Sequence, residues 1–297
     1  MALSSSRNFG MVVFWMAGSL LSFCAVAVSV RALSLRLTVF EILALRNIGG
    51  LLILGAMVLV AREPGMRLRP AKPWIHVLRN VPHFAGQGLW AYGLTVLPLT
   101  TVFAIEFTTP AWVALFAVLF LGERMSVPRL IALVLGFAGV LVILRPGMDS
   151  FRPEALLVAL AAVCFGIQIA TTKFLTSSNS TWTILFWMNL MQLPLNVGAD
   201  LAIGQPLFFL AKLDPSFWLP VTGICVCGLT AHYCLTNAFR HGDAIVVIPI
   251  DFLRVPMIGL IGWLVYAEQP ELAVLIGAAI VISGVLINIY AESRART

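Results

Sequence analysis

The sequence predicts an all-α integral membrane protein with ten transmembrane helices, arranged as two inverted five-helix repeats. Of its 297 residues, 60% are hydrophobic and only 11% are charged, and the mean hydropathy is +0.98. This composition lies outside the range of soluble globular domains. A series of long apolar runs and an internal repeat complete the prediction.

The apolar runs define the predicted helices. Each run is about 20 residues long, which is enough to cross the hydrocarbon core of a bilayer. The segments between the runs are too short for a separate domain, so we expect the function to lie within the membrane. The predicted helices cover residues 10–30, 38–60, 74–98, 100–121, 127–145, 154–176, 181–204, 217–240, 243–266 and 271–290.

The first run has an alternative interpretation as a secretory signal peptide. Arg7 precedes it, and Ala25-Val26-Ala27 has the composition of a cleavage site. The run is long for the apolar part of a signal peptide, and Arg31 follows it as an anchor. We therefore expect a retained transmembrane helix.

Basic residues set the expected orientation. If the N-terminus is cytoplasmic, eleven basic residues lie on the inner side and five on the outer side, so the positive-inside rule places both termini in the cytoplasm of a bacterial-type inner membrane. The net charge of +6 then reports topology and contact with anionic lipid, not nucleic-acid binding. The inner set is Arg7, Arg62, Arg67, Arg69, Lys72, Arg124, Arg129, Lys173, Arg240, Arg294 and Arg296; the outer set is Arg31, Arg36, Arg145, Arg152 and Lys212.

The chain also repeats itself. A shift of 145 positions places residues 92–145 on residues 237–290 without a gap, and it aligns Glu123 with Glu268 and Glu106 with Asp251. Each half therefore has five helices. Two halves with an odd number of helices enter the membrane from opposite sides, which is typical of alternating-access transporters.

Two sequence segments carry a resemblance to a known family. The first is "PAWVALFAVLFLGER" from Pro110, followed by "GFAGVLVILRPG"; the second is the weaker copy "VPMIGLIGWLVYAEQ". The chain resembles the drug/metabolite transporter superfamily, and within it the ten-helix EamA-type exporters, most of all the YddG-type amino-acid exporters. The resemblance implies EamA-like repeats at residues 1–147 and 148–297. In the second copy Pro256 falls one residue late and "AEQ" replaces "GER", so the two halves are not expected to open alike.

Charges inside the predicted spans indicate where gates would lie. Such charges cost about 2.5–3.5 kcal/mol each and therefore face the bundle interior or a cavity. With about 1.5 Å of rise per residue, Arg46 and Glu106 can share an outer layer, and Arg79 and Asp251 an inner layer. We expect these two pairs to gate the two sides, while Arg254 holds Asp251 or binds a substrate carboxylate. The alternative is that the charges only neutralise one another.

The third predicted helix carries a polar stripe. His76, Arg79, His83, Gln87 and Trp90 recur every three or four residues and so share one helical face. In lipid this face must turn inward, and we expect it to form a cavity wall, with His83 and Gln87 near mid-depth. The alternative is a set of hydrogen-bonded packing residues.

Further candidates for the cavity come from other helices. They could also be ordinary packing or interfacial residues, because tryptophans and single polar groups often are. They are Trp112, Gln168, Tyr233 and Asn237.

We expect a transporter and not an enzyme. HExxH, GxSxG and GxxxxGK[ST] are absent, and the five cysteines show no metal-ligand spacing, so we expect no metal, no cofactor and no direct use of ATP. A receptor or scaffold would not require buried charges at both depths. The expected substrate is an amino acid, aromatic or another neutral one, carried by a monomer; the alternative is efflux of cationic or aromatic drugs, or of a nucleoside or sugar derivative. Proton exchange and facilitated diffusion both remain open.

Overall fold

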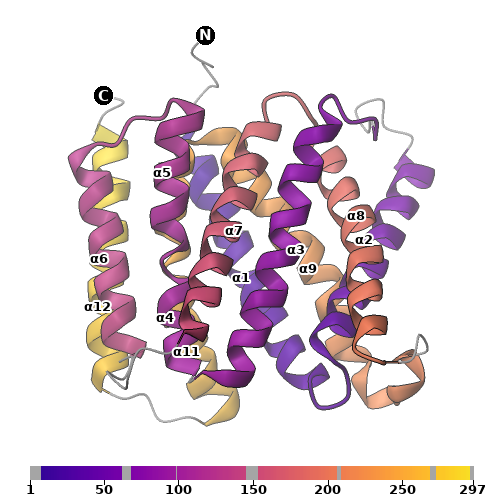
Figure 1. Cartoon of the computed structure of the whole chain (residues 1–297). Coiled ribbons are helices and arrows are strands. Elements are labelled where there is room, and N and C mark those ends of the chain that lie inside the picture. The colour runs from indigo at the N-terminus through magenta and orange to yellow at the C-terminus, as the bar shows by residue number, and fades with distance from the viewer. Residues whose placement is uncertain are drawn as a thin grey trace.

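A computed structural model describes residues 8–61, 68–97, 99–144, 153–205, 209–267 and 272–294. The predicted boundary between the halves, at residues 147 and 148, lies outside these ranges. The described chain is helical throughout (Figure 1). The first half contains α1 (Phe9–Leu33), α2 (Val39–Ala61), α3 (Pro73–Val96), α4 (Leu99–Glu106), α5 (Thr109–Leu121) and α6 (Val127–Leu144).

The second half repeats this order. It contains α7 (Glu154–Leu175), α8 (Thr181–Ala202), the short 3-10 turns η1 (Phe209–Lys212) and η2 (Pro215–Phe217), α9 (Trp218–His241), α10 (Ala244–Asp251), α11 (Arg254–Tyr266) and α12 (Leu272–Arg294). The pairs α4/α5 and α10/α11 each make one crossing. The twelve α-helices of the described residues therefore make ten crossings, as the sequence predicted.

The helix boundaries follow the 145-residue repeat. Adding 145 to the bounds of α4 and α5 gives the bounds of α10 and α11, and the same shift places the start of α6 on the start of α12. Both broken crossings carry a proline just after the break, Pro110 and Pro256. A proline removes a backbone donor and clashes with the preceding turn, so each helix restarts there instead of continuing.

The second segments of the two broken crossings end in the same left-handed conformation. Gly122 ends α5 with φ of 68°, and Ala267, its image in the repeat, ends α11 with φ of 53°. Glycine adopts this conformation without steric cost, whereas alanine does not. The second half therefore carries backbone strain that the first half avoids.

Ala267→Gly is expected to stabilise the protein by about 1 kcal/mol, because a left-handed non-glycine residue costs about 1–2 kcal/mol. Thermal unfolding in detergent measures the change. Gly122→Ala is the matched variant at the image position, and it should lower the unfolding temperature. Equal unfolding temperatures for all three proteins would contradict the argument.

Helix packing reflects the repeat as well. α1 packs along α9, and the images of these helices, α7 and α3, pack along each other. α2 packs on its own image α8, and α6 on its own image α12 (Figure 1). The bundle thus contains two pairs in which a helix packs on the image of a different helix, and two pairs in which a helix packs on its own image.

The seam between α6 and α12 is a close backbone contact. A Cβ built on Gly139 would lie 2.7 Å from the carbonyl oxygen of Gly277, and one on Gly284 would lie 3.2 Å from that of Ala132. Residues 132 and 139 thus face 284 and 277, so these two images run antiparallel, which confirms the inverted repeat. Small residues permit such close packing where the hydrophobic effect cannot drive helices together.

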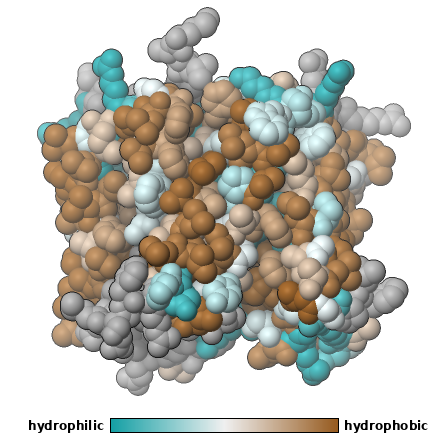
Figure 2. All heavy atoms as spheres, in the orientation of Figure 1, coloured by the Kyte–Doolittle hydropathy of each residue, from teal (hydrophilic) through white to brown (hydrophobic). Residues whose placement is uncertain are grey.

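The outer surface suits a lipid environment. Apolar side chains such as Phe14, Phe120, Leu264 and Leu286 are exposed, and brown apolar atoms cover most of the visible flank, with polar atoms toward the two ends (Figure 2). Six of the described spans are long and apolar enough to cross a membrane by length and composition. α1 begins and α12 ends at the same end of the bundle (Figure 1).

Candidate functional site

The two broken crossings meet at their breaks. Phe107 and its image Phe252 lie in the two breaks, and their rings stack with centroids 6.2 Å apart. Glu106 ends α4 and Asp251 ends α10, so each break carries a carboxylate. The repeat therefore brings its two equivalent acidic positions to the junction of the halves.

Asp251 forms an ion pair with Arg254. The Nη2 of Arg254 donates to Oδ2 of Asp251 at 2.8 Å. The guanidinium also lies over the rings of Phe23 at 5.3 Å and of Phe107 at 5.6 Å. These side chains keep 29% and 19% of their surface exposed, for Arg254 and Asp251 respectively, so the pair is within reach of a solute.

Glu106 has a different partner. Its Oε2 accepts a hydrogen bond from the indole Nε1 of Trp90 at 2.7 Å. Among the described residues, no basic side chain lies within ion-pair distance of it. Glu106 is thus a half-buried carboxylate held by a neutral donor.

Neither of the expected gate pairs is formed. Arg79 donates to Thr172 Oγ1 at 2.9 Å, to Asn80 Oδ1 at 2.8 Å and to the sulfur of Met188 at 3.3 Å, and not to Asp251. α3 packs on α7, α8 and α4, whereas α10 packs on α5, α6, α1, α12 and α9. Similar depth therefore does not make Arg79 and Asp251 neighbours.

Arg46 likewise does not reach Glu106. Its Nη2 lies 3.5 Å from Oε1 of Gln192 on α8, and its Nε has no partner among the described atoms. α2 packs on α8 and α9, while α4 packs mainly on α7 and α6. The two residues expected in an outer layer thus lie in different parts of the bundle.

The polar stripe of α3 turns inward, as predicted. His76 and Arg79 are fully buried and His83 is 6% exposed. His83 Nδ1 and Gln192 Nε2 lie 2.6 Å apart, and Gln87 Oε1 has no partner among the described atoms. The stripe therefore combines satisfied groups with groups that retain hydrogen-bonding capacity.

Most of the other candidates contact neighbouring helices. Tyr233 lies between Trp182 and Trp15, with centroid distances of 4.7 and 5.7 Å. Asn237 accepts from Thr181 Oγ1 of α8 at 3.1 Å, and Trp112 packs on Gly166 of α7 and on Phe116 of its own helix. Gln168 donates to Thr172 of its own helix, α7, at 3.2 Å. The structure thus gives Asn237, Gln168 and Trp112 packing or hydrogen-bonding partners within the bundle.

Several buried polar residues were not among the candidates predicted from the sequence. Asn189, Gln192 and Asn196 form a buried stripe on α8, and His232 on α9 lies with its ring 6.0 Å from that of His83. The stripe has spacings of three and four, the same signal that identified the face of α3. The α8 stripe could therefore have been predicted from the sequence. The contact between His83 and His232 could not, because it depends on how α3 and α9 pack.

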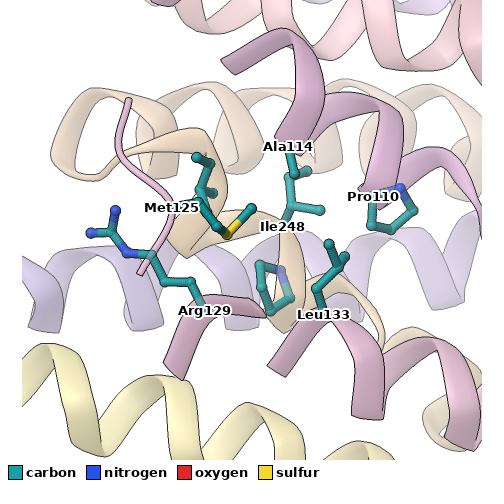
Figure 3. Close-up of a pocket in the computed structure, with 8 residues that line it drawn as sticks. Pro110, Ala114, Met125, Arg129, Leu133 and Ile248 are labelled. Atoms are coloured by element: carbon teal, nitrogen blue, oxygen red, sulfur yellow. The ribbon is translucent and has the colours of Figure 1, made fainter. Parts of the chain in front are cut away.

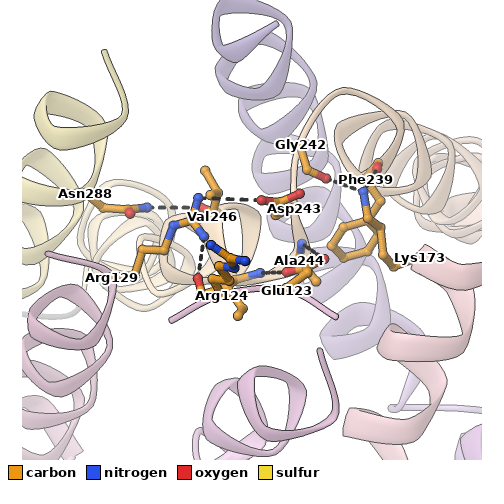
Figure 4. A network of polar contacts seen from close by, with 11 residues as sticks. Glu123, Arg124, Arg129, Lys173, Phe239, Gly242, Asp243, Ala244, Val246 and Asn288 are labelled. Carbon is orange, nitrogen blue, oxygen red and sulfur yellow. Dashed lines mark hydrogen bonds and ion pairs between the residues drawn. The ribbon is translucent and has the colours of Figure 1, made fainter. Parts of the chain in front are cut away.

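One end of the bundle is closed by a polar network around the α9–α10 turn (Figure 4). The carboxylate of Glu123 accepts from the backbone N–H of Ala244 at 2.8 Å and of Ile245 at 2.9 Å. Lys173 Nζ donates to the carbonyls of Phe239 and Gly242, both at 2.6 Å. An anion at a helix N-terminus is favoured because the first N–H groups lack helical partners, so Glu123 ties α10 to the end of α5.

Arg129 and Asn288 add to this closure. Arg129 Nη2 lies 3.5 Å from Oδ2 of Asp243, its Nη1 donates to the carbonyl of Arg124 at 2.7 Å, and Asn288 donates to the carbonyl of Val246 at 3.0 Å. Beneath them lies a small, mostly apolar pocket between α5, α6 and α10 (Figure 3). It is lined by Pro110, Ala114, Met125, Arg129, Leu133, Ile245, Ile248 and Pro249.

In the part of the chain that the structure describes, no group of three or more His, Cys, Asp or Glu side chains could hold a metal ion. The five cysteines are free thiols. The polar chemistry of the interior therefore consists of charges and hydrogen-bonding groups.

Comparisons with known proteins agree with this arrangement. The model of the EamA-like transporter family matches residues 10–145 and 152–290. A riboflavin transporter of Brucella anthropi is 33% identical over 228 residues, which cover 77% of this chain and 80% of the relative. An S-adenosylmethionine uptake transporter of Rickettsia conorii is 30% identical and covers 95% and 93% of the two chains.

Two further comparisons are more distant. A pseudopaline exporter of Pseudomonas aeruginosa is 26% identical and covers 85% and 87% of the two chains. A solved crystal structure matches 96% of this chain and 99% of its own with a TM-score of 0.79 at 18% identity, which supports the fold. None of these relatives is named as an amino-acid exporter, but all three named ones carry small molecules. Two family matches, one on each half of a ten-crossing inverted repeat, show that the chain is a membrane transporter of small molecules that belongs to the EamA-like transporter family.

Proposed function

We propose that the protein carries small metabolites with an amino-acid-type group, or amino acids themselves, by alternating access. The observation that supports this most is the meeting of two broken helices at Phe107 and Phe252. Breaks at membrane depth are tolerated where they lie in protein or line a cavity. In transporters, such breaks at the junction of inverted repeats are where substrates bind.

The charged groups of the interior suit a zwitterion. Glu106 forms no ion pair among the described residues and could take a substrate ammonium or sulfonium group. The cations Arg46 and Arg79 have no carboxylate partner there and could take a carboxylate. An amino acid offers both charges, and so does S-adenosylmethionine, for which one relative is named.

A flat heteroaromatic metabolite is the second candidate. The rings of Phe23, Phe107, Phe252 and Trp90 lie around Arg254 and Glu106, and a relative is named for riboflavin. Stacking on such rings is favourable without any charge on the ligand. A cationic aromatic drug would use the same rings together with Glu106.

Flux into liposomes containing the purified protein tests the proposal. The panel consists of labelled amino acids, S-adenosylmethionine, riboflavin and a cationic aromatic dye, each with and without a pH gradient. We expect saturable flux of at least one amino-acid-bearing compound. Flux of riboflavin or the dye alone would overturn the amino-acid assignment, and a response to the gradient would distinguish proton exchange from facilitated diffusion.

We also propose that both termini are cytoplasmic, on the basis of the eleven-to-five distribution of basic residues. In a variant without the native cysteines, a cysteine at residue 295 should react with an impermeant thiol reagent only after the membrane is opened. Reaction in intact cells would reverse the orientation, and with it the side that the Glu123 network closes.

Replacing His83 or Gln87 by leucine is expected to lower flux about tenfold, because each change leaves a buried polar partner or a substrate group without a hydrogen bond, at a cost of about 1–3 kcal/mol. The amount of protein in the membrane should change little. His241→Leu, at the end of α9, is the matched control. Wild-type flux in both α3 variants would assign the stripe to packing.

A further inference from the structure

Four polar side chains from four helices converge in the part of the bundle away from the broken crossings. Gln192 of α8 contacts Arg46 of α2 through Oε1 and His83 of α3 through Nε2. His232 of α9 completes the group, with its ring 6.0 Å from that of His83. All four are at most 7% exposed, and no carboxylate pairs with any of them among the described residues. The cluster is therefore cationic and buried.

Arg46 differs from three other buried or half-buried arginines of the bundle. Arg240 donates to Thr181 Oγ1 and to the carbonyls of Thr176 and Asn179, and Arg254 is paired with Asp251. Arg79 has three acceptors within 3.3 Å. Arg46 has a single contact at 3.5 Å, and its Nε has no partner in the described chain.

A buried guanidinium in this state is costly. Moving an unpaired charge out of water costs several kcal/mol, and the cost is recovered only when an opposite charge or several hydrogen bonds meet it. Arg46 has the donors for such a partner, because a guanidinium offers five N–H groups in a planar fork that matches carboxylate and phosphate. Its environment is thus incomplete without an anion.

The fold itself does not require this cation. α8 begins 142 positions after α2, and α9 begins 145 positions after α3. The image of Arg46 in the repeat is therefore Met188, and the image of Arg79 is Ile224. The second half builds the same helices with apolar residues at these places. Gly228, the image of His83, leaves the space that the stem of Arg46 fills, since a Cβ there would lie 2.7 Å from Arg46 Cγ.

We propose that Arg46, together with Gln192 and His83, binds the anionic group of the transported metabolite, either a carboxylate or a phosphate. This inference rests on the proposed transport function and names the part of the substrate that the site takes. Arg254, which the sequence also offered as an anchor, is neutralised by Asp251 and does not serve this purpose.

The cluster is connected to the broken crossings by aromatic contacts. The ring of His232 lies 5.6 Å from that of Phe23, and Phe23 lies 5.3 Å from the guanidinium carbon of Arg254. A substrate with its anionic group at Arg46 would therefore extend over Phe23 toward Arg254 and Glu106. An ammonium, sulfonium or aromatic part would occupy that second end.

Matched ligand pairs test the anion site in the purified full-length protein. The pairs are phenylalanine with 2-phenylethylamine, S-adenosylmethionine with its decarboxylated form, and riboflavin 5′-phosphate with riboflavin. Binding is measured by calorimetry in detergent. For at least one pair, the wild-type protein is expected to bind the member that carries the carboxylate or phosphate about 10- to 100-fold more tightly, as charge-assisted hydrogen bonds predict. The first two pairs report a carboxylate site and the third a phosphate site.

Arg46→Gln should bring this preference close to one by weakening the binding of the member that carries the carboxylate or phosphate, and Gln192→Leu should reduce the preference in part. Arg36→Gln, an exposed arginine whose side chain is 57% accessible, is the matched control and should keep the wild-type preference. No preference in the wild-type protein, or a full preference retained in Arg46→Gln, would overturn the inference.

The proposed function fails separately from this inference. Saturable flux into liposomes that is equal for the two members of every pair would support transport and overturn the anion site. A wild-type preference in binding that Arg46→Gln removes, without flux of any panel compound, would support the site and overturn the transport proposal.

Discussion

Asp251→Asn is expected to abolish transport and to destabilise the protein by about 3 kcal/mol. The change leaves Arg254 charged over the rings of Phe23 and Phe107 without its ion-pair partner. Removal of one member of a buried pair typically costs about 3–5 kcal/mol, and the partial exposure of this pair places the expected value at the lower end. Thermal unfolding in detergent and flux in liposomes measure the two effects.

The double variant Asp251→Asn with Arg254→Gln separates the two effects. It removes both charges, so stability should return toward that of the wild-type protein, whereas transport should stay low because the charged groups at the break of α10 and α11 are gone. A single Asp251→Asn variant with unchanged unfolding temperature and flux would show that another group, such as Glu106, compensates Arg254.

Glu123→Ala is expected to open the end of the bundle that the α9–α10 turn closes. The change removes the acceptor of two backbone N–H groups at the start of α10. Loss of a helix N-cap costs about 0.5–2 kcal/mol, and 1.4 kcal/mol corresponds to a tenfold change in population. States in which α10 has left α5 should therefore become about tenfold more populated.

Thiol reactivity reports this opening. In a variant without the native cysteines, a cysteine at Ala114 lies buried in the pocket between α5, α6 and α10, and Glu123→Ala should increase its reaction rate about tenfold, in line with the population change. Glu154→Ala, in the first turn of α7, is the matched control. An unchanged rate at Ala114 would mean that the network around Lys173 and Arg129 holds the closure without Glu123.

The sequence predicted the elements that depend on composition and repetition. The alignment of Glu106 with Asp251 marks equivalent places, because α4 ends at Glu106 and α10 ends at Asp251, although the sequence analysis did not predict that the crossings break there. The spacing of the polar residues also identified the inward face of α3, because a stripe such as His76, Arg79 and His83 is costly to expose to lipid.

Lateral position could not be predicted. The rise per residue gives the depth of Arg79 and Asp251 along their helices but does not say which helices are neighbours. The expected gate pairs therefore joined residues at equal depth, whereas in the structure Asp251 pairs with Arg254, three residues away, which the sequence analysis had given as one of two possibilities for Arg254. Glu123, placed only as part of a motif, binds residues more than a hundred positions later, a contact that only the packing of α5 against α10 creates.

The glycine seam of α6 and α12 bears on the origin of the chain. Gly139 faces Gly277, and the repeat carries this contact onto the one between Gly284 and Ala132. Two identical copies of such a half, inserted into the membrane in opposite orientations, would make this same contact with each other. A single ancestral half, made in both orientations, could have formed this seam as an antiparallel homodimer. Fusion of two copies would then have freed each half to change alone, so that a residue such as Arg46 could arise on one side without its counterpart on the other.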